Sequence, residues 1–162
     1  MATIVAGVDG SDAAQEALRV AVQEARLRGA RLRVVTAWQM PTMAYGAVVF
    51  SPDIDPADFQ DSAGAALAEA LAALGGQAAG VEIERVMRMG QPAQVLIEEA
   101  RGAAMLVVGS RGHGGFAGLL LGSVSHQCAM HAACPVVIVH KPNTPAQQAA
   151  VPAGGRTHLE SQ

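Results

Sequence analysis

The chain repeats one pattern: a short run of apolar and β-branched residues, then a longer segment whose apolar residues recur at helical spacing. Residues 3–8 (TIVAGV) form the first run, and residues 13–28 form the first helical segment, with Ser11 or Asp12 expected to cap it. A run that is apolar at every position is typical of a parallel strand buried on both faces. This repetition predicts strands joined by crossover helices.

The pattern continues to residue 140. Predicted strands cover residues 3–8, 31–38, 81–89, 104–110 and 134–140, and predicted helices cover 13–28, 58–74, 92–101 and 123–132. The 81–89 segment alternates apolar and polar residues, which suits an edge strand with one wet face. We therefore predict an α/β fold: an open, doubly wound parallel sheet with helices on both faces.

Length and composition narrow the choice of function. The chain has 162 residues, which suits one domain, predicted over residues 1–141, followed by a disordered tail over 142–162. A net charge of −3 and 15% charged residues argue against nucleic-acid binding, which depends on clustered Lys and Arg. The N-terminus shows no leader and no apolar run reaches membrane-spanning length, so we expect a cytoplasmic protein with no membrane partner.

A glycine-rich stretch, residues 107–125, follows the fourth predicted strand. It holds six glycines and no carboxylate. Gly109 and Gly112 lie at the strand end, where bare backbone allows close approach of a ligand and dihedral angles closed to other residues. Free amides in such a loop can form a nest for an anion, and the helix predicted after Gly122 adds the positive end of its dipole.

Few charged groups are available to help these amides. Ser123 and Ser125 can add hydroxyl donors, and Arg111, His113 or a bound Mg²⁺ can add positive charge. Lys141 is the only lysine of the chain, which excludes a Walker-type phosphate loop. The stretch therefore predicts a phosphate site made of neutral donors, and the alternative is a structural surface loop.

The motif Gly-x2-Gly-x9-Gly-Ser, from Gly109 to Ser123, together with IVAGVDGS at the N-terminus, resembles the universal stress protein family. The resemblance covers residues 3–140. It implies a five-stranded Rossmann-like sheet in the strand order 3-2-1-4-5 that binds ATP. Together with the shortage of cations near the glycine stretch, this predicts Mg²⁺ bound through the phosphates. The resemblance also implies a homodimer paired through the last strand, from Val136 to His140.

The predicted nucleotide site combines the glycine stretch with the residues that the resemblance implies. It comprises Gly7, Val8, Asp9, Ala37, Gly109, Ser110, Arg111, Gly112, His113, Gly114, Gly115, Gly122, Ser123, Val124 and Ser125. By resemblance, Asp9 approaches the nucleoside and Ala37 offers backbone hydrogen bonds to adenine. The extra glycines at 114 and 115 depart from family members with bulkier residues there, which bears on affinity.

The sequence favours a regulatory nucleotide-binding module in the stress response over an enzyme. No catalytic residue is assigned, because neither a dedicated base nor a cluster of cations accompanies the phosphate loop, so at most slow ATP hydrolysis is expected. AMP or cAMP in place of ATP, a nucleotide-free dimeric scaffold, and an adenylate-forming or pyrophosphatase-like enzyme are the alternatives. For Asp9, the alternatives to a ribose contact are a catalytic carboxylate, a metal ligand and a structural cap.

Two further groups of residues invite a function. The first group comprises His126, Cys128, His131 and Cys134. The spacing of these residues matches no common zinc pattern, so no metal is expected there. The second group lies in the long connection over residues 39–57. These residues are expected to cover a bound base or to form a partner surface, and the alternative is that the connection is mobile and weakly ordered. The second group comprises Met40, Met43, Tyr45 and Phe50.

Overall fold

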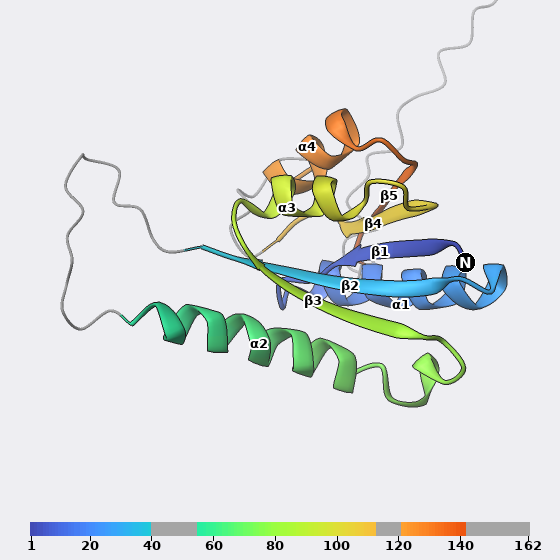
Figure 1. Cartoon of the computed structure of the whole chain (residues 1–162), viewed down its shortest axis with the longest axis horizontal. Helices are drawn as coiled ribbons and strands as arrows, with labels where there is room; N and C mark the ends of the chain where they lie inside the picture. Colours follow the sequence, from blue (N-terminus) through green and yellow to red (C-terminus); the bar gives the residue numbers. More distant parts are fainter. Residues whose placement is uncertain (40–54, 113–120, 142–162) are drawn as a thin grey trace, which may run out of the picture.

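The computed structural model describes residues 1–39, 55–112 and 121–141. Strands and helices alternate, with one short 3-10 helix, η1 (Figure 1). In chain order the elements are β1 (Thr3–Gly7), α1 (Asp12–Arg28), β2 (Arg31–Trp38), α2 (Pro56–Ala72), η1 (Gly75–Ala78), β3 (Ile83–Met89), α3 (Pro92–Glu99), β4 (Met105–Gly109), α4 (Ser123–His131) and β5 (Val136–Val139). Outside the described residues lie the predicted tail, Met40, Met43, Tyr45, Phe50, His113, Gly114 and Gly115.

The predicted elements are present, with ends that differ by a few residues. α2 begins at Pro56 rather than at residue 58, because Asp55 caps it: its Oδ1 accepts the Ala57 N–H at 2.8 Å. α3 ends at Glu99, short of residue 101. β5 begins after Pro135, a residue without an N–H for the strand ladder.

The strands form one sheet in the order β3-β2-β1-β4-β5, and every neighbouring pair is parallel. This confirms the predicted α/β class and its strand order. β1 lies in the middle of the sheet, where Gly7 pairs with Val35 of β2 and Ile4 pairs with Met105 of β4. The carboxyl ends of β1, β2 and β4 therefore meet at one edge of the sheet.

Both faces of the sheet are covered, which explains the continuous apolar runs. α1 and α2 lie on one side and α3 and α4 on the other (Figure 1). In β1, Ile4 packs into the cluster under α1 and α2, and its neighbour Val5 packs into the cluster under α3 and α4. Successive strand residues point to opposite faces, so a strand buried on both sides needs apolar residues at every position.

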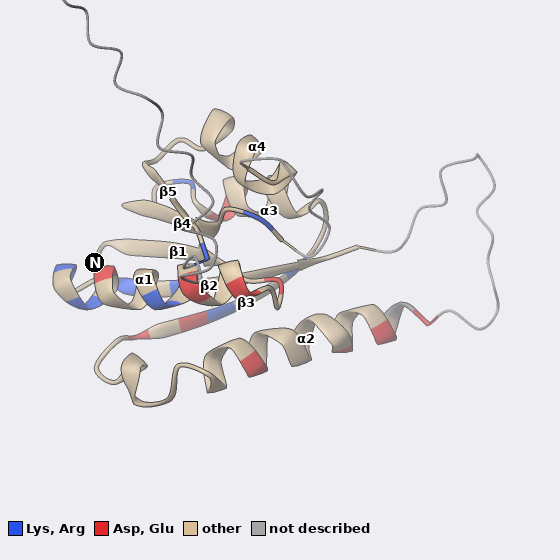
Figure 2. Cartoon of the chain, turned by 180° about the vertical axis from the view of Figure 1, so that it is seen from behind, with Lys and Arg blue, Asp and Glu red and all other residues tan. Residues whose placement is uncertain are grey.

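The edge strand β3 is different, as its alternation predicted. Met87 and Met89 are 40% and 65% exposed, on one face of the strand. Ion pairs tie β3 to the preceding strand β2 and to the following helix α3. Figure 2 shows that charge is unevenly spread, since α2 carries acidic residues and no basic one.

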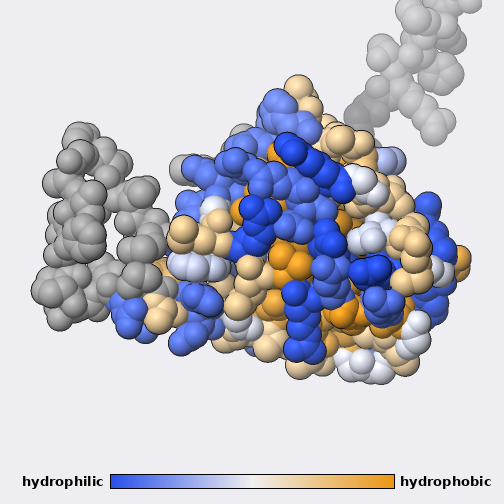
Figure 3. Space-filling view, viewed as in Figure 1, coloured by the Kyte–Doolittle hydropathy of each residue, from blue (hydrophilic) through white to orange (hydrophobic). Residues whose placement is uncertain are grey.

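A network of ion pairs joins β2, β3 and α3. Arg33 bonds Glu84 and Glu99, both at 3.1 Å, and Arg88 bonds Glu98 at 3.0 Å and Glu99 at 2.9 Å. The carboxylates of Glu99 and Glu98 raise the pKa of Arg88 above its ordinary value. Strongly hydrophilic side chains cover much of this side of the molecule, with hydrophobic ones between them (Figure 3). The network holds α3 against the sheet next to the edge where β2 ends.

Candidate functional site

A pocket opens at the carboxyl ends of the central strands. Its volume is about 330 Å³, within the range of small-ligand sites. The ends of β1, β2 and β4 form its base, and the first turns of α3 and α4 stand on either side of it. Ligands of open α/β sheets bind at this place, where the strand order reverses.

The pocket brings together most of the residues that the sequence singled out. The described members of the predicted site that line it are Gly7, Val8, Asp9, Ala37, Gly109, Arg111, Gly112, Gly122, Ser123, Val124 and Ser125. Ser110, the residue after Gly109, is buried and does not line the pocket. His113, Gly114 and Gly115 fall in the part of the chain that the structure does not describe.

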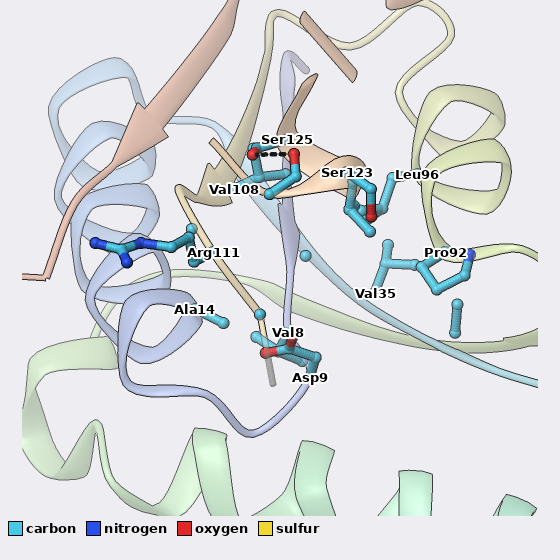
Figure 4. Close-up of a pocket in the computed structure, with 16 residues that line it drawn as sticks. Val8, Asp9, Ala14, Val35, Pro92, Leu96, Val108, Arg111, Ser123 and Ser125 are labelled. Carbon is cyan, nitrogen blue, oxygen red and sulfur yellow. Dashed lines mark hydrogen bonds between the residues drawn. The ribbon is translucent and has the colours of Figure 1, made fainter. Parts of the chain in front are cut away.

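An apolar wall of the pocket was missed by sequence reasoning. Val35 and Val108 come from the strand ends, and Pro92 and Leu96 come from one face of α3, where Figure 4 shows them side by side across from Arg111. Leu96 also explains Gly7, because a Cβ at Gly7 would lie 2.9 Å from Leu96 Cδ1. The spacing of Pro92 and Leu96, four residues apart in a helix that starts at the ligand edge, is the signal that points to this wall.

The glycines of the loop are explained by close contacts, not by unusual dihedral angles. Neither Gly109 nor Gly112 has a positive φ, so the prediction of dihedral angles closed to other residues is wrong at these two positions. Gly122 also has an ordinary φ, of −75°. A Cβ at Gly109 would lie 2.7 Å from the backbone of Ala13 and Ala14, and one at Gly112 would overlap the carboxylate of Asp9. The lack of a side chain at Gly109 therefore lets β4 pack closely against α1, and the lack of one at Gly112 lets the loop pack against Asp9.

Asp9 is built into the turn that starts α1. Its Oδ1 accepts the Ser11 N–H at 3.0 Å and the Ser11 hydroxyl at 2.6 Å. Ser11 Oγ in turn accepts the Ala14 N–H at 3.3 Å, so Ser11 is the N-cap and Asp12 is the first residue of the helix. Asp9 supports the cap without being the cap, and its other oxygen faces Gly112 at the rim of the pocket.

The start of α4 is joined to Ser110, the residue after β4, by hydrogen bonds from Gly122 and Ser125. The Gly122 N–H donates to the Ser110 carbonyl at 2.7 Å, and the Ser125 hydroxyl lies 2.9 Å from that carbonyl and 3.0 Å from the Gly122 carbonyl. Ser125 has one hydroxyl proton and both neighbours are acceptors. The Ser125 hydroxyl is thus directed at carbonyl oxygens, and its predicted donation to a ligand stays a prediction, whereas Ser123 is exposed at the pocket.

The electrostatics of the pocket are nearly neutral. Among the described lining residues, the charged side chains are Asp9 and Arg111. Figure 4 shows the Arg111 side chain extending toward α1, away from Pro92 and Leu96. The remaining polar groups of the described lining are backbone groups, the exposed Ser123 hydroxyl and the Ser125 hydroxyl, which is directed at the carbonyls described above. The first amides of α4 have no partner within the helix, which suits them to an anion.

The His and Cys residues of α4 do not form a site. Burial, with a smaller contribution from Cys134, raises the pKa of the Cys128 thiol to about 11, so it stays protonated near neutral pH. His126 and His131 are exposed on the helix surface. Among the described residues, no three side chains of the His, Cys, Asp and Glu types come together in a way that would hold a metal ion.

Comparisons with known proteins agree with this geometry. The model of the universal stress protein family matches residues 1–140. A universal stress protein of Mycolicibacterium smegmatis is 38% identical over 138 residues, 84% of this chain and 45% of the relative. One from Mycobacterium tuberculosis is 36% identical over 140 residues, 86% of this chain and 46% of the relative. The chain thus spans about half the length of the curated relatives that it matches.

Solved structures similar to this chain include complexes with nucleotides. A universal stress protein in complex with cAMP is 34% identical, has a TM-score of 0.65, and covers 87% of this chain and 98% of its own. A universal stress protein from Archaeoglobus fulgidus in complex with dAMP is 26% identical, has a TM-score of 0.62, and covers 86% of this chain and 98% of its own. In the described part of the chain, every helix is too short or too polar to cross a lipid bilayer.

Proposed function

The chain belongs to the universal stress protein family. From this premise we propose that it is a regulatory protein whose pocket binds an adenine nucleotide, and that this nucleotide is ATP. The observation that carries the proposal is the pocket itself. An apolar wall from β2 and α3 faces the start of α4, whose first amides have no partner within the helix, across a volume of about 330 Å³. This pairing of an apolar half with an anion-binding half suits a nucleoside phosphate.

We assign the two halves of the nucleotide to the two halves of the pocket. The base lies against Val35, Pro92 and Leu96, with the backbone of Ala37 in reach of its edge. Asp9 contacts the ribose, and the phosphates lie at Gly122, Ser123 and Val124. The predicted roles of His113, Gly114 and Gly115 stay predictions.

The residues present fit ATP together with a divalent cation. A triphosphate brings several negative charges, whereas the described lining offers one guanidinium, that of Arg111, and one carboxylate, that of Asp9. Mg²⁺ bound through the phosphates supplies the missing positive charge. We therefore expect ATP binding to depend strongly on Mg²⁺.

A second candidate ligand is cAMP. The universal stress protein structure that is 34% identical to this chain carries cAMP. A cyclic monophosphate has a single negative charge, and a pocket with a nearly neutral lining holds it without a metal ion. Binding of cAMP that is tighter than binding of ATP, and independent of Mg²⁺, would favour this candidate.

We propose that the bound nucleotide regulates the protein and is turned over slowly at most. Among the described lining residues, the one carboxylate is Asp9, and its Oδ1 is already bonded to Ser11. Phosphoryl transfer needs a positioned nucleophile and stabilisation of developing charge, and the described lining offers no dedicated group for the first task. A cytoplasmic location stays a prediction.

We further propose a homodimer that pairs the last strand, from Val136 to His140, with the same strand of a second copy. β5 ends the sheet, and each of its residues is half-buried within the described chain. An apolar strand edge invites pairing with another chain. Light scattering of the purified protein, with a charged substitution at Ile138, tests this assembly independently of the ligand.

Calorimetry tests the proposed function directly. ATP, AMP, cAMP and adenosine are each titrated into the purified protein, with Mg²⁺ and with a chelator, and any small molecule released on denaturation is identified. We expect Mg²⁺-dependent binding of ATP that is tighter than binding of adenosine. No heat and no change in Tm with any adenine nucleotide, on folded protein, would leave the nucleotide-free scaffold as the better account.

A further inference from the structure

Ser125 is a polar side chain in an apolar place. It is 1% exposed, and it lies in the first turn of α4 beside Ser110, which is 2% exposed. In the described part of the chain, the fully buried polar residues are these two serines and Thr36. A buried hydroxyl needs a partner, and the hydrogen bond of Ser125 to the Gly122 carbonyl is drawn in Figure 4.

The residues around Ser125 form a junction of three elements. The Ser110 carbonyl accepts from the Gly122 N–H and from the Ser125 hydroxyl, while the Ser110 N–H donates to the Val139 carbonyl at 2.7 Å. The ends of β4 and β5 and the start of α4 therefore meet at Ser110.

The hydroxyl of Ser125 fixes the first turn of α4 without occupying its amides. A serine at a helix N-cap accepts from an amide, as Ser11 does for Ala14 in α1. Ser125 is the third residue of α4 and points the other way: its single hydroxyl proton is directed at the carbonyls of Ser110 and Gly122, 2.9 Å and 3.0 Å away. The first amides of the helix are thus held in place, and none of them donates to the Ser125 hydroxyl or to another residue of the described chain.

We propose that Ser125 is a positioning residue for the phosphate group of a bound nucleotide, acting through the first turn of α4 and touching no ligand itself. This inference rests on the proposed function. Removal of the hydroxyl leaves both carbonyls with a partner, because the Gly122 N–H still bonds Ser110 and the His126 N–H still bonds the Gly122 carbonyl at 3.0 Å. The variant should fold, with a looser first turn.

The test compares ligands with and without phosphates. In Ser125→Ala, affinity for Mg²⁺-ATP should fall about tenfold, while affinity for adenosine should stay within about twofold, since only phosphate contacts depend on the first turn. Ser125→Thr keeps the hydroxyl and should restore ATP affinity. Ile4→Val is the matched control: it trims a fully buried residue outside the pocket and should change neither affinity.

Amide hydrogen exchange without ligand adds a readout that a general loss of stability would not mimic. Ser125→Ala should speed exchange at Ser123 and Val124 and leave the amides of β1 unchanged, whereas Ile4→Val should not single out α4. If the alanine variant does not fold, Ser125→Cys carries the same test, because it keeps the size of the side chain and is a weak donor.

The outcomes separate this inference from the proposed function. Wild-type protein that binds no nucleotide overturns the proposed function and the role of Ser125 with it. Wild-type binding together with a Ser125→Ala variant that binds ATP normally, or that loses ATP and adenosine equally, overturns the positioning role alone. Unchanged exchange at Ser123 and Val124 in the alanine variant also overturns it.

Discussion

Of the three helices that begin beside the pocket, α1 and α4 differ most clearly in how their first amides are satisfied. α1 is capped within the chain, because Ser11 accepts the Ala14 N–H and Asp12 places a carboxylate in the first turn. α4 begins after Gly122, which has no side chain to accept a bond, and its first turn holds no acid. Both helices follow a central strand of the same sheet, so the strands do not explain the difference.

The difference teaches where the chain leaves room for a ligand. The amides and the positive dipole end of a helix attract negative charge. In α1 that charge is part of the sequence. In α4 the sequence supplies no such charge at the wall of the pocket. Under the proposed function, the phosphate of the nucleotide supplies it. Substitutions can make one helix more like the other, or test how the two helices pack and interact.

The largest expected effect comes from giving α4 its own carboxylate. Gly122→Glu places a negative charge where a phosphate is proposed to lie, and repulsion between like charges at such short range should lower ATP affinity about 100-fold or more. The backbone of Gly122 has a φ of −75°, which any residue adopts, so the variant should fold. Calorimetry measures the affinity, and thermal unfolding checks the fold.

Gly76→Glu is the control for this substitution. It makes the same change of charge in η1, where a Cβ meets nothing within 4 Å, and Gly76 does not line the pocket. ATP affinity should stay at the wild-type value. A folded Gly122→Glu variant with wild-type affinity would contradict the assignment of the phosphate to α4.

The next effect concerns the packing of β4 against α1. Gly109→Ala should lower the free energy of unfolding by about 1–3 kcal/mol, because its Cβ would overlap backbone and not a flexible side chain. The clashing atoms belong to Ala13 and Ala14, 2.7 Å away. Chemical denaturation measures the decrease in stability.

Gly122→Ala is the companion variant. Its Cβ would lie 3.4 Å from the nearest atoms, an ordinary contact, so its free energy of unfolding should change by less than about 1 kcal/mol. Equal stabilities for the two alanine variants would mean that β4 and α1 are not packed as described. The pair separates a glycine needed for packing from one beside a ligand.

Much of the fold could be predicted from the sequence, because strands that are buried on both faces are apolar at nearly every position. Residues 31–38 were predicted and observed as β2, and alternation identified β3 as an edge. The predicted strand ends also indicated where the pocket lies, because ligands of open α/β sheets bind at the carboxyl ends of the strands. The wall from Pro92 and Leu96 was not predicted, because helical periodicity marks Leu96 as buried without saying against what.

Two features of the site depend on contacts that sequence patterns do not contain. Gly109 is bare because of the backbone of α1, which is distant along the chain. Ser125 was expected to face a ligand, but its partners are main-chain carbonyls, and any residue type carries those. The positions of site residues follow from strand order, whereas their roles follow from tertiary hydrogen bonds.

A smaller effect is expected at the capped helix. Asp9→Ala removes the acceptor of the two Ser11 bonds in an exposed turn, which should lower the free energy of unfolding by about 1 kcal/mol. Because the variant also lacks the carboxylate proposed to bind the ribose, its ATP affinity should fall about tenfold. Asp9→Asn keeps an oxygen for Ser11, so its stability should stay near wild type. A destabilised Asp9→Ala variant with unchanged affinity would make Asp9 a purely structural residue.

The smallest effect tests whether the start of α1 is electrically separate from the pocket. Lys141 Nζ pairs with Asp12 Oδ2 at 2.5 Å, and the two side chains are 64% and 75% exposed. An ion pair this exposed contributes little, so Lys141→Gln should lower the free energy of unfolding by about 0.5 kcal/mol or less. The difference from wild type should shrink as salt is added, because salt screens exposed charges. ATP affinity should not change, because the Asp12 carboxylate stays in the first turn of α1 when Lys141 is replaced. A fall of several-fold in ATP affinity would show that the two helix starts share one electrostatic environment, and the contrast between a capped helix and an open one would no longer explain where the ligand binds.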